Sequence, residues 1–210
     1  MSTAAATAPA IYLASQSPRR RELLAQIGVA HRVVGVDVDE SRRGSEAAAD
    51  YVCRLAREKA AAGWARIRAD GLALAPVLGA DTAVVVDDRI LGKPADAAAA
   101  RAMLELLSGR THEVMTGVAV CFAREESGEY GVDTLLSRTR VRFRALSALE
   151  IERYWASGEP CDKAGAYGIQ GLAAVFVEHI EGSYSGVVGL PLFETAELLR
   201  RCGVDHLQRS

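Results

Sequence analysis

Strand-like and helix-like segments alternate along this chain of 210 residues, and no segment repeats another. The strand candidates are short apolar or β-branched runs, and the helix candidates carry apolar residues three and four positions apart. This alternation predicts an α/β fold with a mixed sheet, and no break in composition marks a linker. We expect one domain over residues 11–210, preceded by a frayed Ala- and Thr-rich lead-in over residues 1–10.

Local signals set the expected boundaries. Ser17 and Pro18 form a helix start, and Gly28 a helix stop. Asp87-Asp88 predicts a tight turn. Strands are expected at 11–14, 32–36, 77–80, 83–86, 113–122, 135–143 and 174–179, with the two longest antiparallel and joined by a polar loop at 125–131. Helices are expected at 18–27, 47–68 (the longest), 96–107, 148–156 and 191–202, with a glycine-rich loop at 165–171.

Charge and composition exclude several classes of protein. Lys and Arg number 25 against 27 Asp and Glu, so a protein that coats nucleic acid is not indicated. The most apolar stretch, residues 72–86, is interrupted by Pro76 and Asp81, which speaks against a membrane span. The four cysteines form no metal-binding pair, and we expect reduced, packed thiols in a cytoplasmic protein. The four scattered histidines are expected to be surface or satisfied core residues.

The segment Ser15-Gln16-Ser17-Pro18-Arg19-Arg20-Arg21 is the first candidate for chemistry. If Ser17 caps a helix, Arg19 and Arg20 lie in its first turn, where the helix dipole disfavours cations. Free backbone N–H groups, two guanidinium groups and the Ser15 hydroxyl would together hold a polyphosphate. The alternative is a solvated basic turn.

Two acidic positions form the second candidate. Asp81, in Gly79-Ala80-Asp81-Thr82, stands between β-rich runs, where a carboxylate is costly to bury unless it binds metal or activates water. Glu40 closes the run Asp37-Val38-Asp39-Glu40, whose oxygens suit Mg²⁺ or Mn²⁺. The alternatives are a strand-end turn for Asp81 and a solvated loop for Glu40.

Two lysines complete the candidate set. Lys59 continues the apolar stripe of the longest expected helix, where its stem either snorkels to solvent or brings the ammonium group to a phosphate. Lys93 lies in Leu91-Gly92-Lys93-Pro94, just before a helix, and can equally be plain surface. Pro94 after Gly92-Lys93 excludes the common nucleotide phosphate-binding loop.

These motifs occur in a diagnostic order: LASQSPRRRELL, REKA, LGADTAVVV, GKP, LSGRTHEVMTGVAV, GEPCDKAGAYGIQG and GSYSGVVGLPL. The order resembles the Maf family of nucleotide pyrophosphatases, first known as septum-formation inhibitors. The resemblance implies a Maf/ITPase-like mixed sheet flanked by helices, two lobes around a deep cleft, and a homodimer. It also implies Mg²⁺- or Mn²⁺-dependent hydrolysis of a nucleoside triphosphate to the monophosphate and pyrophosphate. The last two motifs are similar to the branch that acts on dTTP and UTP, not to the branch that acts on 7-methyl-GTP.

The resemblance also implies residue roles. Asp81 would be the catalytic base, and Glu40 with Asp81 would bind the metal ion. The substrate-selecting positions would be Arg19, Thr82 and Gln170, and the phosphate-binding positions Ser15, Arg19, Arg20, Lys59 and Lys93.

Base choice and the alternative functions complete the expectations. The Gln170 carboxamide can pair with the O4/N3 edge of thymine or uracil, and Tyr167 can offer a stacking face. The alternatives are a division regulator that binds nucleotide, nucleic acid or a partner, and an inosine-triphosphate type of purine house-cleaning enzyme.

Overall fold

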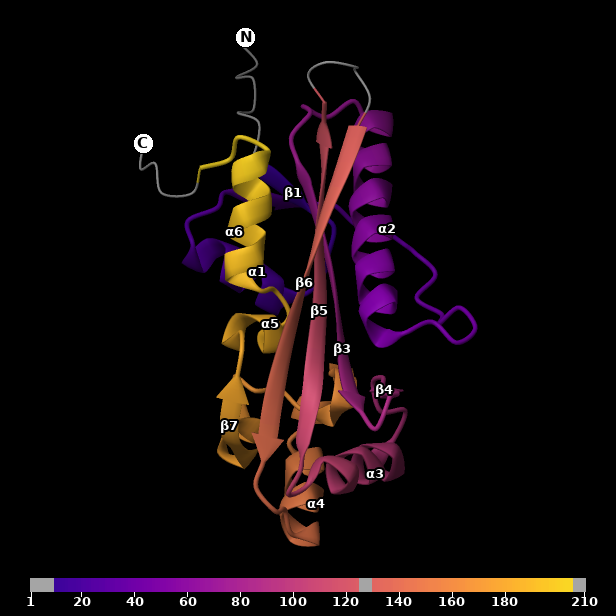
Figure 1. The fold of residues 1–210 in the computed structure, drawn as a ribbon, viewed down its shortest axis with the longest axis vertical. Helices are drawn as coiled ribbons and strands as arrows, with labels where there is room; N and C mark the ends of the chain where they lie inside the picture. The colour runs from indigo at the N-terminus through magenta and orange to yellow at the C-terminus, as the bar shows by residue number, and fades with distance from the viewer. Residues whose placement is uncertain (1–9, 125–129, 206–210) are drawn as a thin grey trace.

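A seven-stranded sheet forms the centre of the computed structural model, which describes residues 10–124 and 130–205 (Figure 1). The strand order is β2-β1-β3-β5-β6-β7, and β4 pairs with β3. β1 pairs in parallel with β2 and β3, and the other pairings are antiparallel, which confirms the expected mixed sheet. The strands are β1 (Ile11–Leu13), β2 (His31–Val33), β3 (Val77–Val86), β4 (Arg89–Leu91), β5 (Thr111–Ala123), β6 (Tyr130–Phe143) and β7 (Val177–Glu181).

Helices cover both faces of the long strands β3, β5 and β6 (Figure 1). One face of β5 turns Val118 and Val120 into a cluster with α1 and α6, and the other turns Ala119 and Cys121 into a cluster with α2. Two covered faces explain why the middle of β5 is apolar at nearly every position. The helices are α1 (Pro18–Gln26), α2 (Ala48–Ala69), α3 (Ala97–Leu107), α4 (Ala148–Ala156), α5 (Tyr184–Val188) and α6 (Leu192–Arg201).

Two glycines let α2 lie directly on the sheet. A Cβ atom on Gly79 would lie 2.4 Å from the carbonyl oxygen of Ala56, and one on Gly117 would lie 2.5 Å from that of Val52. Any larger residue would therefore push the helix away. Gly117 pairs with Asp81 across the β3–β5 ladder, so the close approach brings α2 to the strand position that carries this carboxylate.

A second core lies around Phe143 at the lower end of the molecule in Figure 1, where α3, α4 and β7 pack together. Three short 3₁₀ helices connect this end to the pocket described below: Glu159–Asp162, Ala164–Ala166 and Leu172–Phe176. His112 and Tyr167 pack edge-on against the ring of Phe143.

Several boundaries differ from the sequence expectations. β3 is one continuous strand from Val77 to Val86, so Asp81 lies inside a strand and the expected break around it is wrong. The strand expected at 174–179 begins only at Val177, because residues 172–176 form a 3₁₀ helix. The five-residue helix α5 was not expected. Tyr130 and Gly131 belong to β6, and the rest of the expected polar loop and the lead-in up to residue 9 lie outside the described residues.

The cysteines are all free thiols, as expected, but they are not all packed. Cys121 is buried, whereas Cys161 is exposed on a 3₁₀ helix. Across residues 10–124 and 130–205, no helix combines the length and apolar character that crossing a membrane requires.

Candidate active site

All nine candidate site residues line one pocket of about 660 Å³. This volume is typical of sites that hold a small molecule. The residues come from segments far apart in the sequence, and they are Ser15, Arg19, Arg20, Glu40, Lys59, Asp81, Thr82, Lys93 and Gln170.

The pocket lies where one edge of β3 is left uncovered. β1 pairs with β3 only at Val77 and Leu78, and β4 pairs only with residues 84–86. Among the described strands, none pairs with residues 79–83 on that edge. The gap gives a ligand access to the middle of the sheet, where Asp81 and Thr82 lie.

Asp81 is held by Lys59 at the wall of the pocket. The Lys59 ammonium group lies 2.7 Å from Asp81 Oδ1 and 2.6 Å from Glu40 Oε1. The side chains of Lys59 and Asp81 are only 11% and 13% exposed, so each buried charge depends on the other for compensation. Burial raises the pKa of Glu40, but the hydrogen bond from Lys59 and the positive charges of Lys59, Lys93 and Arg20 together outweigh this effect, so the pKa is lowered overall. Both carboxylates therefore face a shared cation.

Arg20 forms the floor of the phosphate-binding candidate. Its Nε donates to the carbonyl of Gly189 at 2.8 Å, and its Nη1 donates to Ser15 Oγ at 3.1 Å. Burial lowers the pKa of Arg20 while Asp81 raises it, and a guanidinium group stays charged in proteins. Ser15 Oγ also accepts from the backbone N–H of Ser17 at 3.2 Å, so its own proton remains available to an anion.

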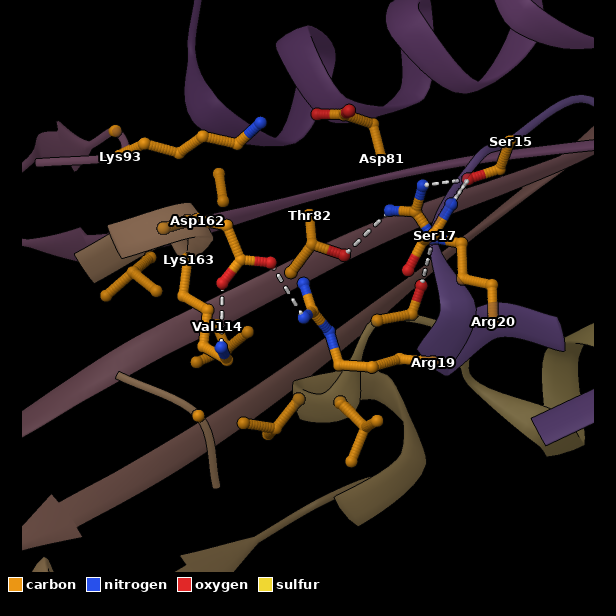
Figure 2. Close-up of a pocket in the computed structure, with 18 of the residues that line it drawn as sticks. Ser15, Ser17, Arg19, Arg20, Asp81, Thr82, Lys93, Val114, Asp162 and Lys163 are labelled. Atoms are coloured by element: carbon orange, nitrogen blue, oxygen red, sulfur yellow. Dashed lines mark hydrogen bonds and ion pairs between the residues drawn. The ribbon is translucent and has the colours of Figure 1, made fainter. Parts of the chain in front are cut away.

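Arg19 reaches across the pocket to a residue that sequence reasoning missed (Figure 2). Its Nη1 lies 3.2 Å from Asp162 Oδ2, and Lys163 donates to Asp162 Oδ1 at 2.7 Å. Burial raises the pKa of Asp162, but the hydrogen bonds from Lys163 and Arg19 and the positive charges of both residues together outweigh it, so the pKa is lowered overall. The motif GEPCDKAGAYGIQG contains both residues, but only the fold reveals that they face Arg19.

The remaining candidates lie around the rim. Lys93 points toward Asp81 in Figure 2. Gln170 is exposed, and its carboxamide makes no hydrogen bond within the described part of the chain. Tyr167 also lines the pocket but is only 5% exposed, and its hydroxyl lies 2.8 Å from His112 Nε2. Because Phe143 and His112 pack against this ring, the expectation of a free stacking face at Tyr167 is not supported.

The acidic residues of the pocket offer oxygen atoms of the kind that a divalent cation prefers. No group of three or more Asp, Glu, His or Cys side chains is placed to hold a metal within residues 10–124 and 130–205. Glu40 and Asp81 are instead a pair, brought together at Lys59. Mg²⁺ in nucleotide enzymes is commonly bound by one or two carboxylates, several waters and the phosphates themselves. The donor set matches that pattern and not a closed protein cage.

This arrangement defines a class of protein. Five cationic side chains and a buried carboxylate line an open pocket of an α/β fold, which suits a polyphosphate ligand and a water attacking it. The chain belongs to the Maf family, described as Maf-like protein, and the match to the family covers residues 10–202.

Relatives of known name cover nearly the whole chain. A dTTP/UTP pyrophosphatase of Bordetella parapertussis is 56% identical over 206 residues, which are 96% of this chain and 97% of that protein. Proteins of the same name are 57% identical in Methylobacillus flagellatus, over 92% of this chain and 93% of that one, and 52% identical in Nitrosomonas europaea, over 93% and 95%. The family expected from the order of the motifs is confirmed.

Proposed function

We propose that this protein hydrolyses dTTP and UTP to the nucleoside monophosphate and pyrophosphate. The observation that carries the proposal is the Asp81 carboxylate, held by Lys59 in the wall of a pocket that Arg19, Arg20 and Lys93 also line. The names of relatives at 52–57% identity support the same activity. The protein is then a hydrolase of acid anhydrides.

The proposed reaction is attack of water on the α-phosphorus. The water oxygen forms a bond to phosphorus, the bond to the bridging oxygen of the β-phosphate breaks, and pyrophosphate leaves with those electrons. Asp81 orients the water and takes its proton. Oδ1 of Asp81 is bonded to Lys59, so Oδ2 is the oxygen left for this task.

The cations of the pocket stabilise the charge that develops on the phosphoryl oxygens. Arg20 is fixed by Ser15 and Gly189 before the substrate arrives, so it needs no reorganisation. Arg19 and Lys163 are paired with Asp162, so each must release this carboxylate before it binds a phosphate group. We propose that Glu40 and Asp81 hold Mg²⁺ or Mn²⁺, which when bound neutralises phosphate charge.

The decisive experiment is pyrophosphate release from a nucleotide panel. Purified protein with Mn²⁺ or Mg²⁺ is mixed with dTTP, UTP, CTP, ATP, GTP, ITP and 7-methyl-GTP. We expect dTTP and UTP to be hydrolysed well ahead of the others. A preference for ITP would support purine house-cleaning, and one for 7-methyl-GTP the other branch of the family. Release of orthophosphate in place of pyrophosphate would contradict attack at the α-phosphorus.

Two further properties belong to this proposal. We propose a homodimer, since large apolar side chains are left exposed on this chain, including Phe193 at 75% and Tyr184 at 50%. Light scattering measures the mass, and a monomer at micromolar concentration would contradict the dimer.

We propose that the protein acts in the cytoplasm, where nucleoside triphosphates are made and consumed. Fractionation of cells tests this location.

A further inference from the structure

A row of three hydrogen bonds leads from the pocket into the sheet. Arg20 Nη2 lies 3.5 Å from Thr82 Oγ1, which lies 3.0 Å from Thr116 Oγ1. Thr116 Oγ1 donates to the carbonyl of Gly186 at 2.8 Å. Thr116 is only 1% exposed and does not line the pocket, whereas Thr82 does (Figure 2). The row therefore connects a pocket residue to the buried face of α5.

The two ends of the row fix the direction of the bond in its middle. A guanidinium group has no acceptor and a carbonyl group has no donor. The proton of Thr116 must therefore lie toward Gly186, since two acceptor oxygens at 2.8 Å would otherwise repel each other. It follows that Thr82 donates to Thr116 and has no proton left for the pocket. Toward a ligand, Thr82 can therefore only accept a hydrogen bond, through the lone pair that Arg20 leaves free.

This acceptor differs from the cations around it. Arg19, Arg20 and Lys93 line the same pocket and can only donate. An acceptor oxygen repels phosphate oxygens and attracts a ligand N–H. Thymine and uracil share an imide N3–H, whereas cytosine has a lone pair at that position. dTTP and UTP differ in the 2′-hydroxyl group of the sugar and the 5-methyl group of the base but share this N3–H edge, so the edge is the group that an acceptor can select.

We propose that Thr116 is a positioning residue for base selection, which keeps the hydroxyl of Thr82 as an acceptor for the imide N–H of thymine or uracil. The proposal rests on the proposed function, because it concerns the same pocket and its nucleotide substrates. In this proposal, discrimination against cytosine depends on Thr116, a residue outside the pocket.

The test compares two changes at Thr116 with a matched control. Thr116→Val keeps the shape and removes the acceptor for the Thr82 proton, whereas Thr116→Ser keeps the hydroxyl. Thr139→Val is the control, because Thr139 is equally buried, lies on the neighbouring strand β6 and bonds to Ser183 at the start of α5 without touching Thr82. The measured quantity is the ratio of kcat/KM for UTP to that for CTP.

We expect Thr116→Val to lower this ratio about tenfold, the effect of roughly one hydrogen bond. Thr116→Ser and Thr139→Val should keep the ratio of the original protein. If Thr116→Val does not fold, Thr116→Ala removes the same hydroxyl and takes its place. An unchanged ratio in the folded variant, or an equal fall in Thr139→Val, would overturn the proposal.

A binding measurement separates this proposal from the proposed function. Calorimetry of UMP and CMP binding needs no turnover, and UMP should bind more tightly in the original protein and lose that advantage in Thr116→Val. If no nucleotide is hydrolysed but this pattern holds, the proposed function fails and the role of Thr116 stands. If hydrolysis is confirmed but the UMP advantage persists in Thr116→Val, the role of Thr116 fails alone.

Discussion

Asp81 is a charged residue in a strand that is otherwise almost entirely apolar. Burying a lone carboxylate is strongly unfavourable, so the position of Asp81 in the strand depends on its ion pair with Lys59, which lies on α2. The same contact leaves one carboxylate oxygen free to act on a water. Stability and proposed chemistry are thus coupled at one residue.

The first prediction concerns that residue. Asp81→Asn keeps the shape of the side chain but cannot take a proton, so kcat for pyrophosphate release should fall by about 10²-fold or more. Glu40 still compensates the charge of Lys59, so the variant should fold. Steady-state kinetics with saturating metal and UTP measure the effect. Turnover close to that of the original protein would remove Asp81 from the role of base.

The second prediction concerns Gln170, which is exposed at the rim of the pocket and whose carboxamide is free to bind a base. Gln170→Ala removes a group that both donates and accepts, so the preference for UTP over CTP should narrow by about tenfold. Turnover of the best substrate should change less. A variant that loses all activity on UTP and CTP alike would show that Gln170 serves the reaction and not the choice of base.

The sequence predicted which residues would share a pocket, but not which side chains would contact them. The nine candidates come from separate motifs, each with its own chemical signal, and all nine line one pocket. The contact between Arg19 and Asp162 joins positions 143 residues apart, and no local pattern reports it. No sequence pattern indicated a functional role for Thr116, because threonine is common in β-strands.

At the scale of elements, long periodic segments were predicted well and short irregular ones were not. The predicted helix over residues 148–156 matches α4, where Ser147 and Glu150 form a capping box. The predicted turn at Asp87-Asp88 is confirmed by positive φ angles of 48° and 58°. In contrast, the segment around Ala166 has a φ of 58° at a non-glycine residue. Tertiary packing sets that conformation against local preference, so sequence patterns miss it.

The third prediction concerns the contact between α2 and the sheet. Gly79→Ala adds a Cβ atom 2.4 Å from the backbone of Ala56, so the helix must move and the free energy of unfolding should fall by about 1–3 kcal/mol. Because Lys59 moves with α2, activity should fall as well. Urea denaturation measures the stability.

Gly92→Ala is the control for this change. A Cβ atom on Gly92 meets nothing within 4 Å, so its effect on the free energy of unfolding should stay within about 0.5 kcal/mol. Equal stability of the two variants would show that α2 does not depend on the close approach at Gly79.

At the scale of the whole molecule, the core around Phe143 contains a histidine that resists protonation. His112 is 2% exposed, its Nδ1 has no partner within the described residues, and its Nε2 faces the Tyr167 hydroxyl. Burial lowers the pKa of His112 from 6.5 to about 4. We expected each histidine to be either exposed or fully hydrogen-bonded in the core. His112 is in the core, but only its Nε2 has a hydrogen-bond partner among the described residues.

The fourth prediction follows from this shift. The folded pKa lies below the unfolded one, so the unfolded chain binds the proton first and stability is lost as pH falls from 6.5 toward 4. The loss should be on the order of 3 kcal/mol at the end of that interval. Denaturation between pH 7 and 4.5 should show a shallower decline in His112→Gln. Parallel curves for the two proteins would contradict a buried neutral histidine.

The contacts of α1 also bear on how the protein is made. Arg20 is completed by the carbonyl of Gly189, which is 169 residues further along the chain. At the usual speed of synthesis, roughly 10–30 s separate the appearance of these two residues. Until Gly189 is made, Arg20 lacks the carbonyl group that holds it, and Arg19 lacks Asp162 until 143 residues have been added. The partners that hold these two arginines in the folded protein are therefore among the last parts of the chain to be made.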